Sequence, residues 1–119
     1  MRLALLGGGT IARLVLQHWR GGGLPGFEIV AILGRTAKSG SATLAREFSI
    51  PYMLERSNLI GATPEVVLEA ASHDAVREHL VPLLDARISV IVLSAGALAN
   101  DVLRSEAERA ATWVRRRRW

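Results

Sequence analysis

The chain has 119 residues, which is enough for one domain and too few for two. Half of the residues are hydrophobic and 22% are charged, a balance typical of a folded domain and not of a disordered segment. There is no cysteine, so disulfides, thiolate metal sites and cysteine nucleophiles are excluded. No apolar run approaches the roughly 18 residues that a membrane span needs. These properties predict a single cytoplasmic domain with no membrane partner.

The positive charge is concentrated at the carboxyl terminus. The formal net charge is +4, and the run Arg115–Arg118 supplies four positive charges, so the rest of the chain is neutral. A basic patch that binds nucleic acid would spread over one face of the domain and would carry aromatic side chains. We therefore expect a basic tail at residues 112–119 and no nucleic-acid partner.

Short apolar runs alternate with segments of helical periodicity, a pattern typical of βαβ units. The first predicted strand, Leu3–Leu6, is followed by a helix that begins at Thr10 and ends at glycines 21–23. A second strand is predicted at Phe27–Leu33, and Ser41 is the expected cap of a short second helix. Apolar residues recur at helical spacing in the first helix at Ile11, Leu14, Val15 and Trp19.

The second half of the chain continues the alternation. Residues 50–63 are weakly patterned and predict a short third strand with irregular chain. Val66–Leu68 is expected to form a buried fourth strand, and Ser72 precedes a helix. Ser89–Leu93 is β-branched and apolar after its first residue, which predicts a fifth strand. A last helix would be capped by Asn100 or Asp101.

This order of elements predicts an α/β fold: a Rossmann-like, doubly wound parallel sheet with strand order 3-2-1-4-5. The domain would occupy residues 1–111 and would end after the fifth strand and its following helix. The fifth strand, Ser89–Leu93, would then be an edge strand without charge or proline to discourage pairing. We therefore expect self-association through this edge.

A glycine-rich turn joins the first predicted strand to the first helix. Residues 7–12 match the pattern G-x-G-x-x-A. In this pattern Gly7 permits the tight turn, Gly9 lets the backbone approach a pyrophosphate, and Ala12 keeps the helix close to the sheet. The amino terminus of the helix offers N–H groups and partial positive charge to phosphates. The turn predicts a dinucleotide site formed by Gly7, Gly9, Thr10 and Ile11.

The residues after the second strand indicate which dinucleotide is bound. NAD sites usually carry an acid there, about 20 residues after the glycines, which bonds the ribose 2′-hydroxyl. This chain instead has Gly34-Arg35-Thr36. A guanidinium pairs with a 2′-phosphate and stacks on adenine, and a threonine hydroxyl can donate a hydrogen bond. The sequence therefore predicts NADP, with NAD as the alternative, held by Arg35 and Thr36.

Two segments of the second half carry a family resemblance. The sequence from Glu69-Ala70-Ala71-Ser72 to Ser94-Ala95-Gly96-Ala97-Leu98 resembles the L-aspartate dehydrogenase family, and the likeness extends over nearly all of residues 1–105. That family oxidises L-aspartate to iminoaspartate with NAD or NADP, in a route to new NAD. The resemblance implies that Ala71 and Ser72 lie along the cofactor, and that Ser94 and Ala97 lie near the nicotinamide.

Members of that family continue into a second domain that binds aspartate and supplies a histidine expected to act in catalysis. This chain has no counterpart of that domain, so we expect dinucleotide binding but no catalysis by these residues alone. His73 and His79 are six residues apart and do not share a helix face, so no metal site is expected. The alternatives are the cofactor domain of a homoserine dehydrogenase or dihydrodipicolinate reductase, and a non-enzymatic dinucleotide-binding module.

Overall fold

A five-stranded parallel sheet forms the centre of the protein, and the computed structural model describes residues 1–93, 105, 108 and 109 of it. The strands are β1 (Arg2–Leu6), β2 (Glu28–Leu33), β3 (Tyr52–Met53), β4 (Val66–Glu69) and β5 (Ser89–Val92). The helices are α1 (Thr10–Arg20), α2 (Gly40–Phe48), α3 (Arg56–Gly61) and α4 (His73–Asp85). The strand order is β3-β2-β1-β4-β5, and every pair is parallel, which confirms the predicted topology.

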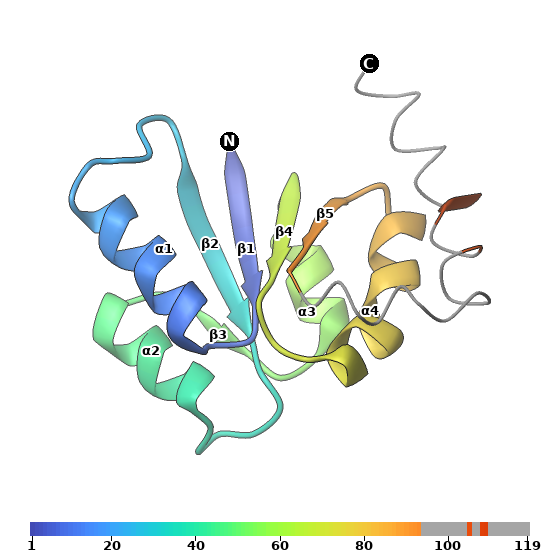
Figure 1. Ribbon diagram of the computed structural model, residues 1–119, viewed down its shortest axis with the longest axis horizontal. Coiled ribbons are helices and arrows are strands. Elements are labelled where there is room, and N and C mark those ends of the chain that lie inside the picture. The colour runs from blue at the N-terminus through green and yellow to red at the C-terminus, as the bar shows by residue number, and fades with distance from the viewer. Residues whose placement is uncertain (94–104, 106–107, 110–119) are drawn as a thin grey trace.

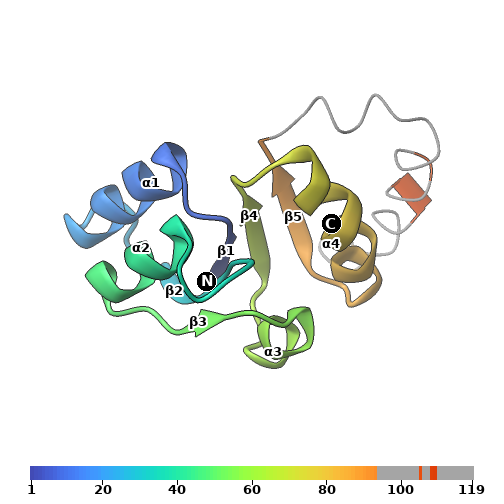
Figure 2. The same ribbon diagram turned by 90° about the horizontal axis from the view of Figure 1, so that it is seen from below.

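Helices cover both faces of the sheet (Figures 1 and 2). One face packs against α1 and α2, and the other packs against α3 and α4. The side chains of β1 show why both faces are apolar: Leu3 and Leu5 join the core under α1 and α2, whereas Ala4 and Leu6 join the opposite core. Because successive side chains of a strand point to opposite faces, a strand that is buried on both sides reads as a continuous apolar run.

The predicted cap of α2 was wrong by two residues. Ser39 is the cap, and its hydroxyl accepts a hydrogen bond from the backbone N–H of Ala42. Ser41 lies inside the helix and is 8% exposed. The reason is tertiary contact: a Cβ on Gly8 would lie only 2.4 Å from the Cα of Ser41. The first turn of α2 therefore packs on the glycine turn, and the helix must begin earlier.

Two further differences arise from tertiary packing. Residues 50–63 contain the predicted short strand but also α3, where an irregular chain was expected. Leu59 of α3 is fully buried, so burial stabilises a helix that has no side-chain cap. In α1 the buried residues are Ala12 and Leu16, whereas Ile11 and Leu14 are 50% and 57% exposed. The close approach of Ala12 to the sheet sets this rotation of the helix.

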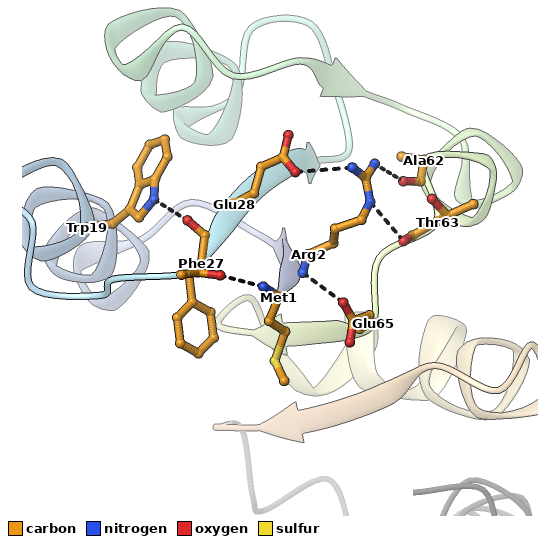
Figure 3. Close-up of polar contacts among 9 residues, drawn as sticks. Met1, Arg2, Trp19, Phe27, Glu28, Ala62, Thr63 and Glu65 are labelled. Carbon is orange, nitrogen blue, oxygen red and sulfur yellow. Dashed lines mark hydrogen bonds and ion pairs between the residues drawn. The ribbon is translucent and has the colours of Figure 1, made fainter.

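Hydrogen bonds close the end of the sheet where β1 begins (Figure 3). The guanidinium of Arg2 donates to the carbonyl groups of Thr63 and Ala62 at 3.2 and 2.5 Å, and forms an ion pair with Glu28 at 3.2 Å. The indole N–H of Trp19 donates to the carbonyl of Phe27 at 3.0 Å. These contacts join the starts of β1 and β2 to the chain that follows α3 and to the last turn of α1, at the end of the sheet opposite the glycine turn.

Several predictions lie outside the described residues. These are the last helix with its cap at Asn100 or Asp101, the tail at residues 112–119, and the candidate site residues Ser94 and Ala97. Within the described part of the chain, no helix combines the length and hydropathy needed to cross a membrane.

β5 lies at one edge of the sheet and pairs only with β4 within the described residues. Ile91 is 52% exposed and Leu93 is 43% exposed. We expect the protein to self-associate through this edge at high concentration, because unpaired strand N–H and C=O groups are a template for another chain. Light scattering across a concentration series measures this, and Ile91→Lys should lower the apparent mass. A monomer at every concentration would contradict the expectation.

Candidate functional site

A cavity of about 320 Å³ opens at the carboxyl ends of β1, β2 and β4. This is the point where the strand order reverses, because β2 and β4 lie on opposite sides of β1. Ligands of doubly wound sheets bind at such a switch point. The lining residues are Leu6 and the glycine turn at 7–9, Leu33 to Arg35 at the end of β2, the cap Ser39 and Ser41 of α2, residues 70–72 after β4, and Ala75, Glu78 and His79 of α4.

The glycines of the turn have different structural roles. Gly7 adopts φ +94°, and a Cβ there would lie 2.5 Å from the Cβ of Ala71. Its N–H donates to the carbonyl of Leu33 at 2.9 Å, which fixes the turn to the end of β2. By contrast, the nearest atom to a Cβ on Gly9 would be 3.9 Å away. Gly7 is therefore required by the fold, whereas the space beside Gly9 is open to a ligand.

Among the residues that the structure describes, no side chain caps the amino terminus of α1. Gly9 occupies the cap position, no described side chain accepts from the first turn, and the first turn contains no acid. In α2 and α4 the hydroxyls of Ser39 and Ser72 accept a backbone N–H. The first N–H bond to Gly9 comes from Arg13, so the preceding N–H groups have no partner inside the helix. This arrangement suits an anion such as a phosphate.

The loop after β2 is organised by Tyr52. Its hydroxyl donates to the carbonyl of Thr36 at 2.5 Å and lies 2.9 Å from the hydroxyl of Ser39. A Cβ on Gly34 would lie 2.1 Å from the Tyr52 oxygen, so a side chain at this position would displace the Tyr52 ring from its present place. Arg35 is exposed at the cavity, and no carboxylate of the described residues pairs with it. Its guanidinium is thus available to an anionic ligand.

Glu69 is a buried carboxylate at the end of β4, with 1% exposure. Its Oε2 accepts from the N–H of Ala71 at 2.8 Å, and its Oε1 accepts from the N–H of Leu93 at 3.1 Å. The backbone of Glu69 also pairs with Val92 in the sheet. One side chain therefore joins the loop that lines the cavity to the chain that leaves β5.

His79 was not predicted as a site residue. It lines the cavity from α4, and Nη1 of Arg56 lies 3.2 Å from its Nδ1. Burial lowers the pKa of His79; the carboxylate of Glu78 opposes this shift, while the guanidinium groups of Arg56 and Arg35 add to it. Helical spacing could have indicated this residue, because positions 72, 75 and 79 share one face of α4.

Of the predicted cofactor residues, Gly7, Gly9, Arg35, Ala71 and Ser72 line the cavity. Thr10, Ile11 and Thr36 are exposed and are not among the lining residues. The sequence did not predict that Gly8, Gly34, Ser39 and the α4 residues Ala75, Glu78 and His79 line the cavity. Groups of three or more residues suited to hold a metal ion do not occur within the described segments.

Comparison with known proteins identifies the kind of domain. Residues 7–117 match the family model described as "Homoserine dehydrogenase, NAD binding domain". The chain is similar to the L-aspartate dehydrogenases of Ruegeria pomeroyi, at 33% identity over 112 residues, and Methanospirillum hungatei, at 30% over 117 residues. These alignments cover 93% and 92% of this chain but only 38% and 44% of those relatives. The chain therefore spans about two-fifths of their length and is similar to their amino-terminal, NAD-binding half.

Solved structures share the fold. An oxidoreductase from Agrobacterium radiobacter in complex with NAD+, L-tartaric acid and magnesium superposes with a TM-score of 0.75 at 20% identity, over 93% of this chain and 33% of that chain. Aspartate dehydrogenase from Thermotoga maritima gives 0.64 at 23% identity, over 94% of this chain and 41% of that chain. At these identities the likeness establishes a Rossmann-like fold.

Proposed function

Because the chain belongs to the family of NAD-binding domains described for homoserine dehydrogenase, we propose that it binds NADP(H) as the cofactor domain of an aspartate dehydrogenase-like oxidoreductase. The observation that carries the proposal is the uncapped amino terminus of α1 at the glycine turn, facing the same cavity as Arg35. The amino terminus of α1 suits a pyrophosphate, and the guanidinium of Arg35 suits a 2′-phosphate.

Different residues of the cavity would bind different parts of the dinucleotide. The pyrophosphate would lie against Gly9 and the first N–H groups of α1, with Thr10 and Ile11 beside it. The adenosine ribose would lie at Arg35, with Thr36 close by, and the chain at Ala71 and Ser72 would follow the cofactor. Ser94 and Ala97 would lie near the nicotinamide. When bound, the nicotinamide supplies the hydride acceptor or donor.

L-Aspartate is the proposed substrate of the complete enzyme, which would form iminoaspartate and so contribute to NAD biosynthesis. The support is the similarity to several L-aspartate dehydrogenases over 92–93% of this chain. The family model carries the name of a homoserine dehydrogenase, so oxidation of a homoserine-like substrate is the second candidate. Substrate screening of a full-length relative separates the two, since the relatives are more than twice as long as the part that aligns with this chain.

The cofactor preference gives the direct test. We expect the chain to bind NADPH more tightly than NADH by about 1–3 kcal/mol, the range for hydrogen bonds to a charged group. Arg35→Ala should remove most of this difference and leave NADH affinity nearly unchanged. Calorimetric titration of both cofactors measures it, and Arg46→Ala, on the exposed side of α2, is the matched control. Equal affinities in the unaltered chain would refute the NADP preference.

Catalysis should require more than these residues. Hydride transfer needs the Cα–H of the substrate held against the nicotinamide and a group that moves the proton. We expect purified residues 1–119 to show no aspartate-dependent reduction of NADP or NAD above background, measured as absorbance of the reduced nicotinamide. Aspartate-dependent turnover above background would contradict this expectation. If the turnover per chain also rose with protein concentration, it would indicate a site assembled between copies of the chain.

A further inference from the structure

His79 lies where two cavities meet. Its side chain is 14% exposed, and it lines both the cavity at the glycine turn and a second cavity of about 450 Å³ beside α3 and α4. The proposed function assigns no role to this ring. A partly buried imidazole in the wall of a binding cavity is a candidate ligand contact, because its polar atoms retain hydrogen-bonding capacity where water is restricted.

Arg56 decides which ring nitrogen of His79 carries the hydrogen. Its Nη1 lies 3.2 Å from His79 Nδ1 and also donates to the carbonyl of Glu78 at 3.1 Å. A guanidinium only donates, so Nδ1 accepts, and the neutral ring then carries its hydrogen on Nε2.

The charges around the ring favour the neutral form. Burial, Arg56 of α3 and Arg35 after β2 lower the pKa of His79, and Glu78 of α4 is the group that opposes them. The carboxylate of Glu78 lies 3.6 Å from Nε2, beyond a good hydrogen bond, and is 58% exposed. The Nε2–H donor is thus available to a ligand in the cavity.

The position of Arg35 indicates which part of the ligand this donor meets. Arg35 and His79 line the same cavity, from the loop after β2 and from α4. The end of the second strand faces the adenosine ribose in dinucleotide-binding sheets. We propose that the neutral His79 ring donates a hydrogen bond from Nε2 to the adenosine half of the bound dinucleotide, with Arg56 as the positioning residue that fixes the tautomer. This proposal rests on the dinucleotide-binding function above.

Two substitutions of His79 separate donation from packing. His79→Asn places an amide near the Nδ1 position and can keep the contact with Arg56, but it has no donor at the Nε2 position. His79→Gln extends an amide N–H toward the Nε2 position. NADH is the probe, because it lacks the 2′-phosphate and so does not depend on the phosphate contact of Arg35.

Fluorescence titration of the 119-residue chain with NADH at pH 7.5 should show His79→Asn binding about three- to tenfold more weakly, the range for one hydrogen bond, and His79→Gln binding within about twofold of the unaltered chain. Equal affinity of His79→Asn and the unaltered chain would overturn the assignment, as would a Gln variant as weak as the Asn variant. If the unaltered chain bound no NADH or NADPH, the proposed function and this inference would both fail.

The tautomer of the His79 ring can be measured separately from the affinity for NADH. In the unaltered chain, nitrogen-15 NMR of the His79 ring should report hydrogen on Nε2 alone, and Arg56→Met should give a mixture of both tautomers with weaker NADH binding. Hydrogen on Nδ1 in the unaltered chain, or an unchanged tautomer in Arg56→Met, would overturn the role of Arg56 even if NADH binds well.

Discussion

Gly7→Ala should destabilise the fold by about 2–5 kcal/mol, because it combines backbone strain with overpacking. The φ of +94° is unfavourable for any residue with a Cβ, and the added methyl would lie 2.5 Å from the Cβ and 2.7 Å from the Cα of Ala71. The loop at Ala71 cannot move away easily, since its N–H is held by the buried Glu69. Urea denaturation followed by circular dichroism measures the change.

Gly9→Ala is the matched control for this prediction. Its added Cβ would meet nothing closer than 3.9 Å, and its φ is not positive, so the stability should change by no more than about 1 kcal/mol. The same methyl would occupy the space proposed for the pyrophosphate, so NADPH affinity should fall at least about tenfold. Equal loss of stability in both variants would contradict the division of roles, as would normal NADPH binding by Gly9→Ala.

The sequence was sufficient for the topology because the strands are short apolar runs separated by helix-length segments. Leu3–Leu6 and Ser89–Leu93 are recognisable without tertiary information, and the order of a doubly wound sheet follows from the alternation. The cap of α2 could not be predicted in the same way. Ser39 and Ser41 are both acceptable caps locally, and only the packing of Ser41 against Gly8 decides between them.

The sequence predicted those parts of the candidate site whose geometry is set by a local motif. It did not predict those parts that form where segments distant in the sequence come into contact. The glycine turn and Arg35 follow directly from the ends of two strands. The contact of His79 with Arg56 joins α4 to α3, a helix that is stabilised by the burial of Leu59 rather than by a local signal. Glu69 was visible only as part of a family motif, and its buried bonds to two loops depend on the pairing of β4 with β5.

Glu69→Gln should destabilise the protein by about 1–3 kcal/mol, although it changes only one oxygen to an NH₂ group. The two carboxylate oxygens accept separate backbone N–H groups, from Ala71 and Leu93. An amide has one accepting oxygen, so its NH₂ would face a backbone donor at one of the two positions. The N–H of Leu93 also donates to the backbone carbonyl of Glu69 at 3.1 Å and would keep that bond, so the cost comes from two donors facing each other at a buried side chain. The site has 1% exposure and little room for a compensating water.

Where the NH₂ faces Ala71, the loop that lines the cavity would lose its hydrogen bond to residue 69, so NADPH affinity should fall together with stability. Glu28→Gln is the control: Glu28 also lies at a strand end, but its ion pair with Arg2 is 66% exposed on the glutamate side, and such surface pairs contribute little. Urea denaturation of both variants, with NADPH titration at a temperature where each is folded, gives the comparison. If Glu69→Gln resembled Glu28→Gln in both measurements, the carboxylate would not be the link between the loops after β4 and β5.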